Sequence, residues 1–107
     1  RSSYYSDFTF GLWDGSQLSP IGKAYFGFDD NELKVLDKFV RNNTIKKFGP
    51  VREVDKTFVI EIAFDAVNES NRHKSGVALR FPRIKRLRED KPANEVIQLS
   101  QFKSEFL

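Results

Sequence analysis

The chain has 107 residues, a length typical of one domain, and its 18 Lys and Arg against 15 Asp and Glu give a net charge of +3. It contains no cysteine, which excludes disulfides, Cys-ligated zinc and a thiol nucleophile. No apolar run approaches the roughly 18 residues of a membrane-spanning helix, so we expect no membrane partner.

The N-terminal part of the sequence predicts an antiparallel hairpin. Residues 7–13 alternate apolar and polar side chains, which is typical of a half-buried strand. The pair Asp14-Gly15 follows and is common in hairpin turns. Residues 18–26 then form the expected return strand, and Pro20 places its start toward a sheet edge.

A helix is predicted next. Asp29 with Glu32 three residues later forms a capping box, and apolar residues at helical spacing follow. We expect this amphipathic helix to end near Asn42-Asn43. Residues 44–50, which include the basic pair Lys46-Lys47, are predicted to form a loop.

Three further strands and a terminal helix are expected in the second half. Residues 51–54 predict a short strand, and residues 57–67 predict a long strand with one apolar face. Residues 77–88 predict a last strand, interrupted at Pro82 by a bulge or a sheet edge. Apolar residues at helical spacing predict a terminal helix within residues 94–106.

This order of elements favours a mainly β fold in which one helix is inserted between antiparallel strands. The natural candidate is the OB-fold, a small, partly open Greek-key barrel that binds nucleic acid on one face. An SH3-like barrel or an α+β sandwich would give a similar pattern. Residues 1–107 are expected to form a single domain.

No self-contained active site is predicted. Glu61 and Asp65 would lie roughly 13 Å apart on one strand face, too far for a glycosidase-like carboxylate pair, so a solvated face is the better interpretation. His73 is the only histidine and has no partner at metal-ligand spacing. No Gly-rich phosphate-binding loop of the Walker or dinucleotide type occurs.

Positive charge is concentrated in residues 72–91, which hold eight Lys and Arg against Glu89 and Asp90. A charge run usually solvates an exposed face. Here the run is rich in arginine, whose planar fork suits phosphate, and Phe81 lies between Arg80 and Arg83, where an exposed ring could stack on bases. Nucleic-acid or polyphosphate binding is therefore favoured over a passive surface.

The sequence SGVALRFPR at residues 75–83, followed by RLREDK at 86–91, resembles the last signature motif of ATP-dependent DNA ligases. The order of the predicted elements also fits the C-terminal OB domain of that family, and the bacterial type in particular. The resemblance implies an enzyme that seals nicks in three steps. A lysine is adenylylated by ATP, the AMP moves to the 5′-phosphate, and the 3′-hydroxyl then displaces AMP.

The Lys-x-Asp-Gly motif that carries the family's nucleophilic lysine is absent. The most similar segment is Leu12-Trp13-Asp14-Gly15, which has Leu12 in place of the lysine. The chain lacks an initial Met and opens abruptly, so we expect a fragment of a longer ligase, inactive by itself. The adenylation domain of the same polypeptide is then its partner. The resemblance implies work in DNA repair, replication or recombination, in the bacterial cytoplasm at the nucleoid.

Site residues follow from the motif. The resemblance implies that the pyrophosphate of ATP is contacted by Arg86, Arg88, Asp90 and Lys91 when the domain closes. It implies that the domain then swings to meet nicked double-stranded DNA through Lys74, Ser75, Arg80, Phe81 and Arg83. ATP and Mg²⁺ are the implied cofactors, bound mostly through the missing domain.

The sequence differs from the family's OB domain in one respect, and two alternative functions remain open. Family OB domains begin with an apolar strand and a Gly-rich basic turn ahead of the region of Arg1, so the barrel is expected to lack its first strand. Such a barrel has an open edge that could pair with another chain. A stand-alone nucleic-acid-binding OB module and a protein-interaction domain for an acidic partner are the alternative functions.

Overall fold

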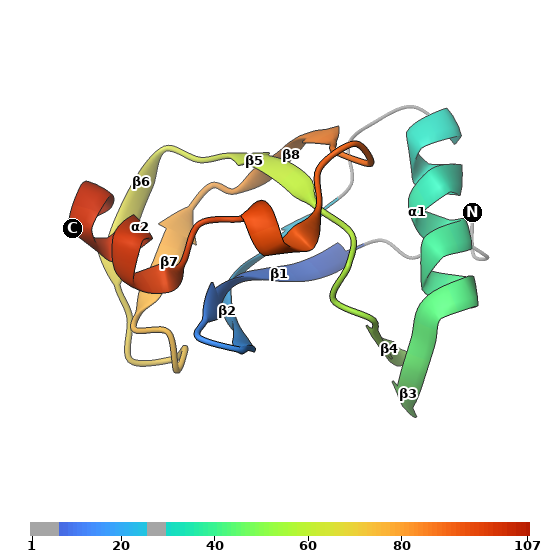
Figure 1. Cartoon of the computed structure of the whole chain (residues 1–107), viewed down its shortest axis with the longest axis horizontal. Helices are drawn as coiled ribbons and strands as arrows, with labels where there is room; N and C mark the ends of the chain where they lie inside the picture. The colour runs from blue at the N-terminus through green and yellow to red at the C-terminus, as the bar shows by residue number, and fades with distance from the viewer. Residues whose placement is uncertain (1–6, 26–29) are drawn as a thin grey trace.

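The computed structural model describes residues 7–25 and 30–107, and Figure 1 shows how the elements are arranged. The order along the chain is β1 (Asp7–Asp14), β2 (Gln17–Tyr25), α1 (Asp30–Asn43), β3 (Thr44–Phe48), β4 (Val51–Val54), β5 (Ile60–Ala63), β6 (Ala66–Glu69), β7 (Val77–Arg80), β8 (Arg83–Leu87), the 3₁₀ turn η1 (Ala93–Glu95) and α2 (Leu99–Phe106).

The predicted N-terminal hairpin is confirmed. β1 and β2 pair antiparallel from Asp7 opposite Tyr25 to Asp14 opposite Gln17, and Gly15 in the turn has a φ of 66°. The register shifts at Phe10/Gly11. A Cβ atom at Gly11 would lie 2.3 Å from the carbonyl oxygen of Ser19, so the two strands approach too closely there for any other residue.

β5 to β8 form one long antiparallel ribbon with a bend in the middle. β5 pairs with β8 and β6 pairs with β7, and between the two pairs the amide of Asp65 donates to the carbonyl of Arg80 at 2.9 Å. At the bend Phe81 has a φ of 52°, and Pro82 has no N–H to give to a ladder. The predicted interruption at Pro82 is thus confirmed.

The same bend corrects the prediction of one strand over residues 57–67. The structure has β5, a break at residues 64–65 and then β6, because the paired chain cannot continue its hydrogen bonding past Phe81 and Pro82. Residues 57–59 precede β5 without strand pairing. An apolar alternation in the sequence cannot reveal a break that the partner strand imposes.

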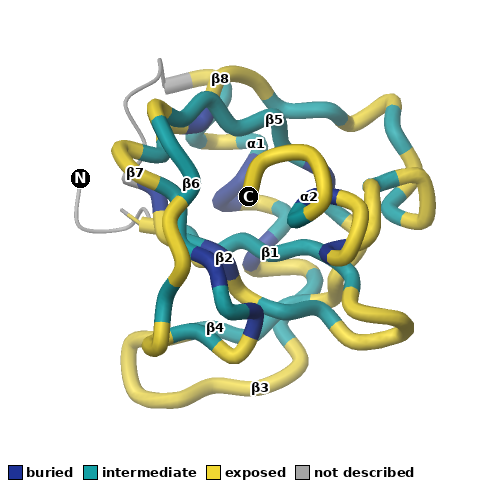
Figure 2. Tube along the Cα trace, turned by 90° about the vertical axis from the view of Figure 1, so that its left-hand side faces the viewer, coloured by how far each residue is buried: buried dark blue, intermediate teal, exposed yellow. Residues whose placement is uncertain are grey.

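Two other predicted elements differ. Residues 44–50 were predicted to form a loop, but β3 pairs with β4 in a hairpin. Its apolar side chains Ile45, Phe48 and Val51 are exposed, and Figure 2 shows β3 in the colour of exposed residues. The strand therefore has no buried face to create an alternating pattern. The terminal helix was predicted from residue 94, but residues 93–95 form η1 and α2 begins at Leu99.

α1 is confirmed over Asp30–Asn43, whereas the predicted cap Asp29 lies outside the described residues. The core gathers where α2 covers the strands, around Ile21, Val77, Leu99 and Phe102. The fold is predominantly β and consistent with an OB-like fold, as predicted, and its described strands pair as four two-stranded antiparallel sheets. Within the described part of the chain, no helix has the length and apolar character needed to cross a membrane.

Candidate functional site

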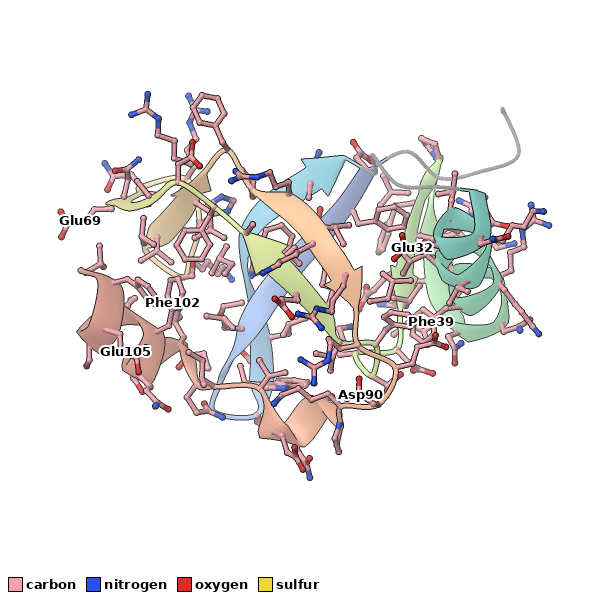
Figure 3. All side chains as sticks on the ribbon, turned by 90° about the horizontal axis from the view of Figure 1, so that it is seen from above. Glu32, Phe39, Glu69, Asp90, Phe102 and Glu105 are labelled. Atoms are coloured by element: carbon pink, nitrogen blue, oxygen red, sulfur yellow. The ribbon has the colours of Figure 1, made fainter. Side chains whose placement is uncertain are left out.

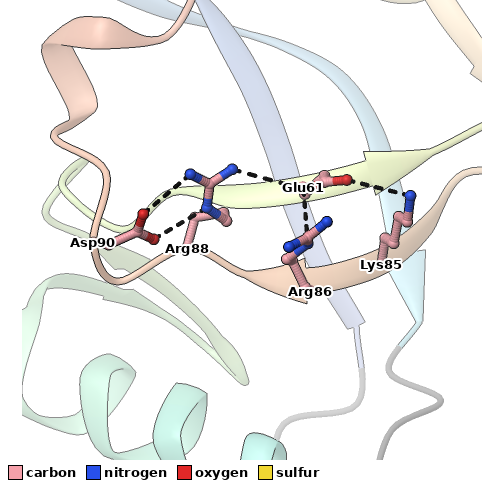
Figure 4. Close-up of polar contacts among 5 residues, drawn as sticks. All are labelled: Glu61, Lys85, Arg86, Arg88 and Asp90. Carbon is pink, nitrogen blue, oxygen red and sulfur yellow. Dashed lines mark hydrogen bonds and ion pairs between the residues drawn. The ribbon is translucent and has the colours of Figure 1, made fainter.

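The C-terminal half of the basic run, residues 83–91, forms β8 and the turn that follows it, and one carboxylate lies next to three of its cations. Glu61 on β5 is paired with Arg86 in the strand register, and its Oε1 atom lies 2.9 Å from the Nε of Arg86 and 3.7 Å from Nη1 of Arg88. The Nζ of Lys85 lies 3.5 Å from Oε2 (Figure 4). Glu61 thus holds three cations of the segment in one fixed cluster.

A second carboxylate, that of Asp90, also binds Arg88. Its Nε and Nη2 atoms donate to the two carboxylate oxygens of Asp90 at 3.0 and 3.1 Å, a bidentate contact. Hydrogen bonding to Asp90, followed by its negative charge, raises the pKa of Arg88. The hydrogen bonds from Arg88 lower the pKa of the Asp90 carboxyl. The guanidinium therefore stays charged and is oriented before any ligand arrives.

Replacing Asp90 with asparagine tests this contact through pH. Because the pKa of Asp90 is lowered by folding, its ion pair stabilises the fold above its ordinary pKa of 3.8. We expect wild type to exceed Asp90→Asn in stability at pH 5–7, modestly since both groups are solvated, and this difference to be lost as pH falls from 3.8 through the lowered pKa that Asp90 has in the folded state.

Urea unfolding at pH 7, 5, 3 and 2 measures the difference. Glu89→Gln is the control, because it removes the neighbouring carboxylate outside the bidentate contact. A difference between wild type and Asp90→Asn that persisted at pH 2 would show that asparagine disturbs the turn itself and that ionisation of Asp90 is irrelevant.

Lys91 lies beside Arg88 because the chain turns between them. The amide of Lys91 donates to the carbonyl of Arg88 at 3.2 Å, and the amide of Arg88 donates to the carbonyl of Val59 at 2.9 Å. These two hydrogen bonds close the turn and hold it against Val59, the residue that precedes β5. Arg88, Glu89 and Lys91 then line one side of an open hollow of about 480 Å³, whose other side is α1.

A second group of predicted residues lies at the bend of the ribbon. The Phe81 ring is 63% exposed, and the guanidinium carbon of Arg80 lies 5.3 Å from its centroid. Nη1 of Arg83 donates to the carbonyl of Phe81 at 2.8 Å and to Oδ1 of Asp65 at 3.1 Å. Arg83 therefore braces the bend, and the exposed Arg80-Phe81 pair stands on its outer side.

The other two predicted DNA contacts differ from each other. Lys74 is exposed in the loop between β6 and β7, which the amide of Ser70 closes by donating to the carbonyl of Gly76 at 2.9 Å. Ser75 is only 1% exposed, and its hydroxyl donates to the carbonyl of Pro20 at 2.8 Å. The Ser75 side chain holds the loop against β2, and its burial leaves it no surface for a ligand.

The structure therefore brings two groups of predicted residues to opposite ends of β8, with Arg80, Phe81 and Arg83 at the bend and Arg88, Asp90 and Lys91 at the turn. Arg86 lies within β8, and Lys74 and Ser75 lie on the loop before β7. Four strand steps, roughly 13 Å, separate Arg83 beside the bend from Leu87 before the turn. Sequence reasoning missed Glu61, which it assigned to a solvated face. Glu61 lies opposite Arg86 because of the strand register, which pairs residues far apart in the sequence. One hint of this pairing is present in the sequence, an acidic residue on one predicted strand and basic residues on the next long one.

The similarity to known proteins extends over the basic run and most of the rest of the chain. A family model described as the ATP dependent DNA ligase C terminal region matches residues 1–91. The chain is 46% identical over 110 residues to a probable DNA ligase of Koribacter versatilis, with 99% of this chain and 19% of that protein covered.

A probable DNA ligase of Opitutus terrae is 43% identical over 103 residues, with 94% of this chain and 10% of that protein covered. A DNA ligase of Methanococcoides burtonii is 38% identical over 94 residues, with 88% and 16% covered. The chain thus spans between 10% and 19% of the length of these relatives.

Proposed function

Because the chain belongs to the family of C-terminal regions of ATP-dependent DNA ligases, we propose that it is the OB module of such an enzyme. In this role residues 1–107 form one part of a longer polypeptide whose adenylation domain carries the nucleophilic lysine. The module closes over ATP during lysine adenylylation and afterwards grips nicked duplex DNA at the nucleoid.

The observation that carries this proposal is the separation of two cationic groups by the length of β8. The turn after β8 presents Arg88 and Lys91 side by side, and the bend before β8 presents Arg80 with an exposed ring. A module that serves two steps needs two surfaces, each complete in itself. Rotation about a flexible linker can then bring each surface to the reacting phosphates in turn.

For the first step, the turn has the chemistry that pyrophosphate departure requires. Charge accumulates on the leaving pyrophosphate, and preorganised cations stabilise it without having to reorient during the reaction. Arg88 is preorganised by Asp90 on one side and Glu61 on the other. Arg86, whose Nε lies 2.9 Å from Glu61, adds positive charge next to it.

Mg²⁺ fits this part of the chain poorly. Within residues 7–25 and 30–107, no group of three or more metal-ligating side chains gathers at one place. Of the carboxylates in and beside the motif, Glu61 and Asp90 are paired with arginine. We therefore assign the magnesium ligands to the rest of the polypeptide and derive no step of this module through the ion.

For the second step, the bend offers a ring and a cation to DNA. Phe81 can stack on a base or sugar edge, while Arg80 lies against the ring and can reach a phosphate. Lys74 on the neighbouring loop is a further candidate for backbone contact, and Arg83 acts by holding the bend in shape. Ser75 supports the loop from inside.

Replacing Phe81 with alanine tests the DNA surface. Stacking of a base on an aromatic side chain contributes about 1–3 kcal/mol, so we expect affinity for nicked duplex to fall by roughly 5- to 150-fold in the longer polypeptide. Electrophoretic mobility shift with a nicked duplex measures the affinity. Formation of the enzyme–AMP adduct is expected to remain at the wild-type rate.

Phe48→Ala is the matched control, because Phe48 is 57% exposed and lies on the β3–β4 hairpin away from the bend. Equal losses of nick affinity in the two variants would remove the special role of Phe81. A loss of adduct formation in Phe81→Ala would contradict the division of the two steps between the two surfaces.

A further inference from the structure

The hollow beside the turn has a second wall that the motif does not include. Val35, Lys38, Phe39 and Asn42 of α1 line it, and their spacing of three, four and seven residues places them on one face of the helix. Figure 3 shows Phe39 and Asp90 on the same side of the molecule, opposite the end that carries Phe102.

We propose that α1 is the second half of the phosphate site, with Lys38 binding the same pyrophosphate as Arg88 and Lys91. Lys38 would act in this way only if the module serves adenylyl transfer, so the inference rests on the proposed function. It extends that function from one contiguous motif to a site built by two elements distant in the sequence.

The charges that line the hollow favour an anion. Lys38, Arg88 and Lys91 contribute three positive charges and Glu89 one negative charge, while Asp90 and Glu61, which do not line the hollow, pair with Arg88. Arginine has five N–H donors; Asp90 accepts from Nε and Nη2 of Arg88, and Glu61 lies 3.7 Å from its Nη1. Donors on Arg88 and the ammonium groups of both lysines are therefore available in number to hold several phosphate oxygens at once.

The floor of the hollow keeps its two walls together. The rings of Phe39 on α1 and Phe58 before β5 meet edge to face, with centroids 4.9 Å apart. Phe58 and Val59 line the floor, and the carbonyl of Val59 accepts the amide of Arg88. The apolar side chains in the lining leave less water around a bound anion, which strengthens its attraction to the cations.

The size of the hollow suits a phosphate chain rather than a single ion. Its volume is about 480 Å³, which leaves room for the two phosphate groups of pyrophosphate. The hollow is open on its outer side, so the nucleoside end of ATP could extend from it toward another domain. Inorganic pyrophosphate is then the smallest probe that carries the relevant chemistry.

Titration of the 107-residue chain with inorganic pyrophosphate, followed by amide NMR, tests the second wall. We expect shifts at Lys38 and Asn42 as well as at residues 88–91. Lys38→Ala is expected to weaken pyrophosphate binding roughly fivefold, the upper end of what one exposed ion pair contributes. Lys38→Arg is expected to restore most of the affinity, which a purely structural role would not require.

Lys34→Ala is the matched control, because Lys34 is an exposed lysine one turn earlier on α1 that does not line the hollow. Shifts confined to residues 88–91, or equal weakening by Lys34→Ala and Lys38→Ala, would overturn the role of α1. So would an absence of pyrophosphate binding. None of these results depends on whether variants of Arg88 or Lys91 slow adenylylation in the longer polypeptide. The role of α1 and the proposed function can therefore fail independently.

Discussion

Lys91→Ala is expected to slow formation of the enzyme–AMP adduct by about 100- to 1,000-fold in the longer polypeptide. This is the usual effect of removing one preorganised group that stabilises charge in a transition state. The backbone bond that closes the turn brings Lys91 close to Arg88, and both residues line the same hollow. Single-turnover assays with labelled ATP measure the rate.

A pre-adenylated nick separates this step from the others. We expect Lys91→Ala to seal such a nick at the wild-type rate, since no pyrophosphate leaves in that reaction. The intact sealing also shows that the variant is folded. Lys47→Ala on the exposed β3–β4 hairpin is the charge-matched control. An unchanged adduct rate in Lys91→Ala would contradict the phosphate role assigned to the turn.

Phe102→Ala is expected to lower the free energy of unfolding by about 3–5 kcal/mol, the usual cost of deleting a buried aromatic side chain. Phe102 is 6% exposed and belongs to the core with Val77 and Leu99. Its ring also contacts Phe64 at 6.1 Å and Phe106 at 4.8 Å between centroids. Because domains of this size are stable by only about 5–15 kcal/mol, the loss would be a large fraction of the total.

Phe106→Ala provides the comparison, because Phe106 lies one turn later on α2 and is 48% exposed. Its loss removes little buried surface, so we expect a decrease of about 1 kcal/mol or less. Urea unfolding of both variants measures the difference. Equal decreases would mean that Phe102 does not anchor α2 to the strands.

Local features of the fold were predictable from the sequence. Asp14-Gly15 marks the hairpin, and helical spacing marks α1, because each signal depends on neighbours in the chain. Pro82 correctly predicted an interruption in its own strand. The matching break at residues 64–65 was not predictable, since it arises from the partner strand across the ribbon.

The candidate site divides in the same way. The turn residues Arg88, Asp90 and Lys91 are contiguous, so the motif contained them all. Glu61 enters through strand register, and Lys38 enters through the packing of α1 against the segment before β5, neither of which has a local signature. Ser75 is the opposite case: it lies inside the motif, but it is buried and serves the fold.

The backbone conformation of Phe81 has a consequence for how this protein could be improved. A non-glycine residue in the left-handed region loses roughly 1–2 kcal/mol, and an exposed ring recovers little of this by packing. Glycine would relax the backbone at this position, whereas our proposed DNA contact requires the ring. If Phe81 contacts DNA as proposed, selection for thermal stability alone would favour variants at position 81 that weaken this contact, so stabilising substitutions should be made elsewhere in the chain.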